Sequence, residues 1–181
     1  MPTPKRKTVI KGAVQAVVLA AALVAARATA PKTPVNITGQ MQVYKQTGDK
    51  LIPIGGKYNL IMGAGWRQLW KLFANTDSVH FDTLSRIQVG SDTTTADTSQ
   101  AALSFATPAE KRVDSVRAGA VSVRYYATFL SAQGNFPWRE IGLFNRDSTK
   151  AYATMFDRVN VSLGTKIAAD TWVVKVTLSG S

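Results

Sequence analysis

The chain lacks the residues on which most metal, redox and nucleophilic sites depend. None of its 181 residues is a cysteine, which excludes disulfides and thiolate metal sites. Its single histidine, His80, excludes a histidine-rich metal cluster and leaves no credible Ser-His-Asp triad. Phosphate-binding loops, dinucleotide fingerprints, zinc-protease motifs and EF-hand loops are also missing. We therefore expect no enzymatic activity, no catalytic residues, no cofactor and no bound metal.

Acidic residues are missing from the first quarter of the chain. No Asp or Glu precedes Asp49, whereas seven of the 22 lysines and arginines do. The rest of the chain contains 15 basic and 11 acidic residues. The first 48 residues therefore supply +7 of the formal net charge of +11. An acid-free basic end predicts an acidic partner. An acidic protein surface, packaged DNA and anionic lipid all stay open as that partner.

Charge of either sign is absent from residues 12–26, which read GAVQAVVLAAALVAA. At about 1.5 Å per helical residue this run is about 22 Å long, shorter than the roughly 30 Å hydrocarbon core, so we predict no membrane span. The basic start, apolar middle and following small residues imitate a secretory signal peptide. That layout keeps a secreted or membrane-anchored bacterial β protein as an alternative, although Lys11 beside the apolar run argues against it.

The same run predicts a buried helix. Ala and Leu favour helix, and neither Gly nor Pro interrupts the chain from residue 13 to residue 30. Residues 1–34 are therefore predicted to be a basic, apolar helical arm that serves assembly, ended by Pro31 and Pro34. The predicted assembly interface combines the basic cluster with one apolar seam of 4-3-4-3 spacing: Lys5, Arg6, Lys7, Ile10, Val14, Val17, Ala21 and Val24.

Residues 35–181 read as a single, mainly β domain. Apolar and polar residues alternate over residues 37–44 and 121–129, which is typical of half-buried strands. Trp172, Val174, Val176 and Leu178 predict a closing strand with one buried face. Short strands separated by polar turns favour an antiparallel β-sandwich. One short packed helix is predicted from Trp66, Leu69, Trp70 and Phe73, whose i, i+3, i+4, i+7 spacing makes an apolar face.

Two stretches of the domain carry a family resemblance. Ile87-Gln88-Val89-Gly90 precedes a loop rich in Ser, Thr, Asp and Ala at residues 91–100. Asn135-Phe136-Pro137 then leads into the most specific stretch, which reads WREIGLFN: Trp138, Arg139, Glu140, Ile141, Gly142, Leu143, Phe144 and Asn145. Together with residues 164–174 these stretches resemble a recurrent module of tailed-bacteriophage virion proteins. The likeness covers residues 59–178 and leaves the arm unexplained.

The resemblance implies a structural virion component that works with other virion proteins. Such modules occur in tail-fibre, tail-tip, and head-fibre or decoration proteins, and fibre-like members are often homotrimers. We therefore expect a tail, fibre-attachment or tail-tip protein. A capsid decoration or head-fibre protein is the alternative, in which the basic arm binds an acidic capsid surface. The resemblance transfers no catalytic residue to this chain.

Overall fold

The computed structural model describes residues 36–73, 79–80, 84–147 and 154–181. The predicted arm, including its eight interface residues, lies outside the described residues and stays a prediction. The chain from Asn36 to Ser181 forms one compact unit.

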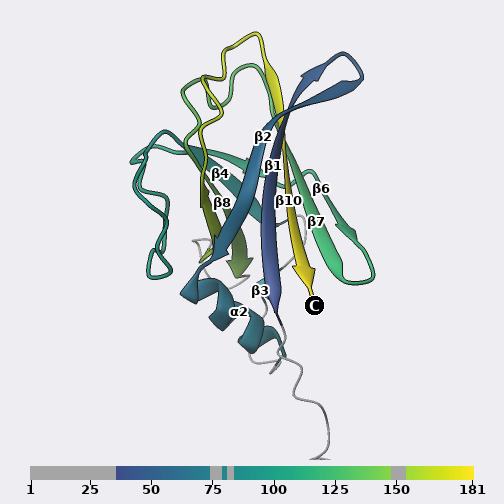
Figure 1. Cartoon of the computed structure of the whole chain (residues 1–181), viewed down its shortest axis with the longest axis vertical. Coiled ribbons are helices and arrows are strands. Elements are labelled where there is room, and N and C mark those ends of the chain that lie inside the picture. The colour runs from purple at the N-terminus through teal and green to yellow at the C-terminus, as the bar shows by residue number, and fades with distance from the viewer. Residues whose placement is uncertain (1–35, 74–78, 81–83, 148–153) are drawn as a thin grey trace, which may run out of the picture. The chain divides into compact units, whose positions relative to one another are not determined.

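The unit consists of antiparallel strands and one helix (Figure 1). The helix is α2 (Gly63–Phe73), and it follows the long hairpin of the first two strands. The strands are β1 (Ile37–Thr47), β2 (Lys50–Ile61), β3 (Val79–His80), β4 (Arg86–Gly90), β5 (Ala109–Arg112), β6 (Ser115–Ala118), β7 (Ser122–Phe129), β8 (Glu140–Asp147), β9 (Thr154–Asn160) and β10 (Thr171–Gly180). Their order is β5-β4-β8-β9-β2-β1-β10-β7-β6, with β3 added beside β8.

Two segments join the halves of this sheet. Strand β2 pairs with β1 along its length and with β9 only through its last residues, Leu60 and Ile61. Between β5 and β6 the Val113 N–H bonds to the Ser85 carbonyl, and the Asp114 N–H bonds to the Tyr126 carbonyl. The chain thus switches partners from one half to the other there.

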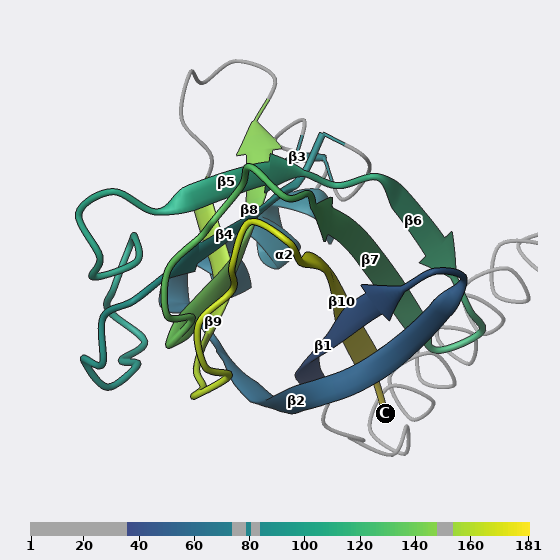
Figure 2. The ribbon, with the colours of Figure 1, turned by 90° about the horizontal axis from the view of Figure 1, so that it is seen from above.

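The sheet consequently curls around the main hydrophobic core (Figure 2). The prediction of a mainly antiparallel β domain with one short helix is confirmed. Within that class, the predicted antiparallel β-sandwich has the form of one continuous curled sheet, because β2 and the β5–β6 segment each pair with both halves.

Aromatic and branched side chains from both halves fill this core. The predicted inward face of β10 is confirmed, since Trp172, Val174, Val176 and Leu178 are all buried. Opposite them lie Ile87, Val89, Ile141 and Leu143 from β4 and β8. These residues follow the two-residue period of a strand with one face toward the core.

Helix α2 packs against the end of the core with only part of its apolar face. Trp66 and Leu69 contact the core, as their spacing predicts. Trp70 is 62% exposed, so the prediction of a continuous packed aromatic face is wrong at this residue. Gly65 allows the close approach of helix and sheet, because a Cβ there would lie 2.3 Å from the Phe156 carbonyl oxygen of β9.

Candidate functional site

The WREIGLFN stretch lies inside the protein. Strand β8 begins at Glu140 and runs between β4 and β9. Of the eight residues only Arg139 is exposed, and the other seven are buried. A strand buried on both faces specifies packing, so its side chains organise the structure around them.

Trp138 anchors the start of the stretch. Its indole Nε1 donates to the Gly134 carbonyl at 2.8 Å, and Gly134 adopts a φ of 65°, which favours glycine. The ring packs edge-on against Phe129 and Trp172, with centroids 4.9 and 4.8 Å away. Such aromatic pairs add stability beyond the burial of their area. The residue thereby fastens the 134–138 turn to the core.

Glu140 forms a buried ion pair with Arg158 of β9. Glu140 Oε2 lies 2.7 Å from Arg158 Nη2, and both side chains are fully buried. The carboxylate also accepts the N–H groups of Ser104 and Phe105 at 3.0 and 2.7 Å. Arg158 in turn donates to the Thr94 carbonyl and to Gln100. This pair therefore fixes the 91–105 loop onto the sheet.

The far end of the stretch connects the sheet to the helix. The Asn145 amide donates to Gln68 Oε1 of α2 at 3.3 Å, and its Oδ1 accepts the Ser85 hydroxyl at 3.1 Å. Gly142 lies between Glu140 and Asn145 and leaves room for two neighbouring side chains. A Cβ at this position would lie 2.9 Å from Phe144 Cε2 and 3.1 Å from Leu103 Cδ2. The polar side chains of Glu140 and Asn145 are therefore engaged in internal contacts, whereas Arg139 is exposed.

Asp157 is a buried carboxyl with no cationic partner among the residues that the structure describes. Its Oδ1 accepts the Leu143 N–H at 3.1 Å, and the Asn59 amide donates to its Oδ2. Burial raises the pKa of Asp157 to about 8, against the opposing effect of these two hydrogen bonds. The side chain is accordingly neutral at pH 7. Asp157 lies in the buried region where β2 pairs with β9, so its neutral side chain contributes to packing there.

Lys166 is another buried ionisable side chain, and it has a positional role. Its Nζ donates to the Leu130 carbonyl at 2.8 Å and to Asn135 Oδ1 at 3.1 Å. Burial lowers its pKa, while the nearby Asp170 charge acts in the opposite direction. The lysine ties the loop before β10 to the 130–135 turn.

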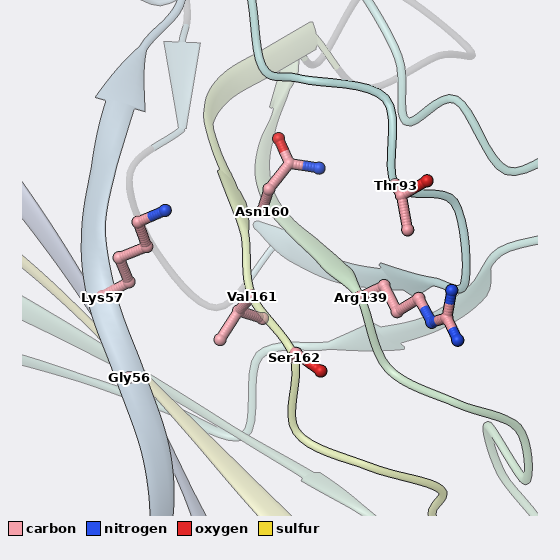
Figure 3. A pocket seen from close by; sticks show the side chains of 7 residues that line it. All are labelled: Gly56, Lys57, Thr93, Arg139, Asn160, Val161 and Ser162. Carbon is pink, nitrogen blue, oxygen red and sulfur yellow. The ribbon is translucent and has the colours of Figure 1, made fainter.

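A groove opens where β2 diverges from the chain that follows β9. It has a volume of ≈ 580 Å³ and is lined by Gly56, Lys57, Thr93, Arg139, Asn160, Val161 and Ser162. Figure 3 shows Lys57 extending from β2 and Arg139 lying on the far side of the 160–162 segment. The lining holds two cations, two hydroxyls and one amide, with no carboxylate or histidine. It offers hydrogen bonds and positive charge but no group suited to act as a general base near pH 7.

The threonine-rich loop, which contributes Thr93 to this groove, contains two carboxylates, Asp92 and Asp97. Asp92 accepts the Thr94 N–H at 2.6 Å, and Asp97 accepts the Ser99 N–H at 2.8 Å. Hydrogen bonds from the Thr94 and Ser99 hydroxyls, together with these N–H bonds, hold the pKa of each carboxyl below its usual range. Both are turn-forming contacts within the loop. Throughout the part of the chain that the structure describes, no group of three His, Asp or Glu side chains could hold a metal ion.

Sequence reasoning missed the buried charges Asp157, Arg158 and Lys166. A weak signal for the first two is the adjacent apolar pair Met155-Phe156, which indicates a strand covered on both faces. No helix among residues 36–73, 79–80, 84–147 and 154–181 is long and apolar enough to cross a membrane. Comparison of the chain with protein-family models, curated proteins and solved structures finds no match.

Proposed function

We propose that this protein is a non-enzymatic structural component of a tailed-bacteriophage virion. It acts as a tail, fibre-attachment or tail-tip protein and assembles with other virion proteins through its N-terminal arm. The observation that carries the proposal is the WREIGLFN strand, whose residues resemble the phage module and are used for internal packing. A motif whose residues build the fold is consistent with a subunit that acts by assembling with other proteins.

The β1–β2 hairpin supports an assembly role. Its tip stands clear of the rest of the sheet (Figure 1), and Leu51 and Ile52 are each 49% exposed. Further along β2, Tyr58 is 73% exposed and Leu60 is 39% exposed. Apolar side chains gathered on one strand favour contact with another protein, since burying them there is stabilising.

A capsid decoration or head-fibre protein remains the second candidate. The acid-free first quarter of the chain favours it, because an arm of residues 1–34 with a charge of +6 suits an acidic capsid surface. A homotrimer is the expected form for a fibre-like subunit. Copy number separates the two locations, since hundreds of copies per particle indicate the head and a few or tens indicate the tail.

The decisive experiment compares purified particles made with the full chain and with a chain lacking residues 1–34. Quantitative mass spectrometry of the particles gives the copy number of each. We expect the truncated protein to be folded and soluble but absent from particles. Normal incorporation of the truncated chain would refute anchoring by the arm, and absence of the full chain from particles would refute the virion role.

A further inference from the structure

Five neighbouring strands form a continuous sheet without any acidic residue. Strands β2, β1, β10, β7 and β6 contain six lysines and arginines and no Asp or Glu. Their inner face is the core, so the side chains between the core residues point to the outer face. This outer face is therefore formed only by neutral and basic side chains.

The pairing register places the outer side chains in rows. One row contains Tyr58, Gln40, Thr177, Arg124 and Arg117, each opposite the next across β2, β1, β10, β7 and β6. The adjoining row contains Gly56, Gln42, Lys175, Tyr126 and Ser115. Three cations and two tyrosines from chain positions 58–175 thus gather on one surface.

Arg117 and Arg124 lie directly opposite each other on β6 and β7. Like charges in this arrangement destabilise a sheet. Both residues are exposed, and neither takes part in an ion pair within the described part of the chain. The register therefore sets two exposed cations side by side, an arrangement that suits an anionic ligand.

Two cations on this face are held against aromatic rings. The Arg117 guanidinium lies 5.4 Å from the Tyr126 ring centroid, and Lys175 Nζ lies 5.6 Å from that of Tyr44. Such contacts position a cation without neutralising it. Two carboxylates that flank these strands in sequence are engaged: Asp114 before β6 with the Thr128 N–H and Lys111, and Asp170 before β10 with Lys45.

We propose that this outer face binds a single-stranded nucleic acid. Phosphates are held by Arg117, Arg124 and Lys175, and the exposed Tyr58 ring stacks with a base. Basic side chains interleaved with aromatic rings on an open surface are the usual platform for single strands. Nucleic acid is favoured over an acidic protein because arginine forks match phosphate and tyrosine matches base faces. The inference goes beyond the virion role and does not depend on it.

The test measures binding of fluorescein-labelled dT20 to the full-length protein by fluorescence anisotropy over a series of salt concentrations. The Arg117→Ala/Arg124→Ala variant should bind at least tenfold more weakly at low salt. Its plot of log affinity against log salt should be shallower by about 1.4, which is about 0.7 for each of two lost phosphate contacts. The basic arm is present in both proteins, so the difference isolates the sheet.

Two further variants separate charge from stacking. Tyr58→Ala should weaken binding by about fivefold or more and leave the salt slope unchanged. Arg139→Ala removes an exposed cation from the groove and serves as the matched control, with affinity and slope unchanged. The double arginine variant should also unfold at an equal or higher urea concentration, because a repulsive pair is removed.

Equal affinity of the double arginine variant and the unchanged protein for dT20 would overturn the proposal. Retention of poly-glutamate without binding of dT20 would also overturn it and would identify an acidic-protein surface. Incorporation of the double variant into particles is measured in parallel. Loss of dT20 binding with normal incorporation supports the nucleic-acid site independently of the virion role.

Discussion

Replacing Asp157 by Asn should remove a strong pH dependence of stability. Asp157 is completely buried, its carboxyl pairs with Asn59 and the Leu143 N–H, and its pKa is raised from 3.8 to about 8. The folded protein therefore holds a proton between about pH 4 and pH 8 that the unfolded chain has lost. Protonation of the folded state stabilises it at low pH, and this contribution is lost as the pH rises toward 8.

The magnitude follows from the proton difference. One proton bound only in the folded state changes the free energy of unfolding by about 1.4 kcal/mol per pH unit. From pH 5 to pH 7 the difference is close to one full proton. The unchanged protein should thus lose about 3 kcal/mol relative to Asp157→Asn over these two pH units.

The substitution suits the site. Its amide oxygen can accept the Leu143 N–H in place of the carboxyl oxygen. Its amide N–H₂ can donate to Asn59 Oδ1, which accepts no hydrogen bond from the described residues. A turn of the Asn59 amide provides that contact without any change in volume. The variant should consequently fold and should be more stable than the unchanged protein at pH 7.

Urea denaturation followed by the fluorescence of the buried Trp138 and Trp172 measures this difference at pH 5, 6 and 7. Asp97→Asn is the control, because the Asp97 carboxyl is exposed and its pKa is lowered. Its contribution to stability is lost only as the pH falls through its folded pKa, so its curve should parallel that of the unchanged protein between pH 5 and pH 7. Parallel curves for Asp157→Asn as well would refute the assignment of a neutral buried carboxyl.

Two substitutions test the packing around the motif strand. Glu140→Gln leaves the Arg158 charge buried without its counter-charge and should cost about 3 kcal/mol or more in urea denaturation. Glu110→Gln, which breaks the exposed pair with Arg86, should cost less than about 1 kcal/mol, and equal costs would contradict the role of burial. Gly65→Ala should destabilise by about 1–3 kcal/mol despite the better helix propensity of Ala, because its Cβ meets the Phe156 backbone. Gly180→Ala, which meets open space, should be nearly neutral in the same melt, and a stabilised Gly65→Ala would show that α2 is free to shift.

Much of the fold could be predicted from local patterns. The alternation at residues 121–129 and 171–178 predicted β7 and β10, because a strand with one buried face repeats every two residues. Strand β2 continues through the glycine pair at residues 55–56 and carries a bulge opposite Val43 and Tyr44. Pairing with β1 overrides the weak strand propensity of glycine there.

The candidate sites could be predicted less well from the sequence than the fold. Glu140 and Arg158 are 18 residues apart, and nothing in their neighbours indicates that β8 and β9 bring them together. Arg117 and Arg124 appear scattered among acidic residues along the chain, but the sheet separates them from those acids and sets them opposite each other. A contact of this kind depends on strand pairing, which short-range patterns do not encode.

The sequence by itself determined the class of the domain, the buried face of its strands and the acid-free first quarter of the chain. Those properties depend on residue type and spacing along the chain, which the sequence states directly. Only the tertiary structure decided that the sheet is continuous, that four ionisable side chains among the described residues (Glu140, Asp157, Arg158 and Lys166) are buried, and that the cations share one face. Each of these depends on which strands become neighbours, because register and burial arise from contacts between distant segments.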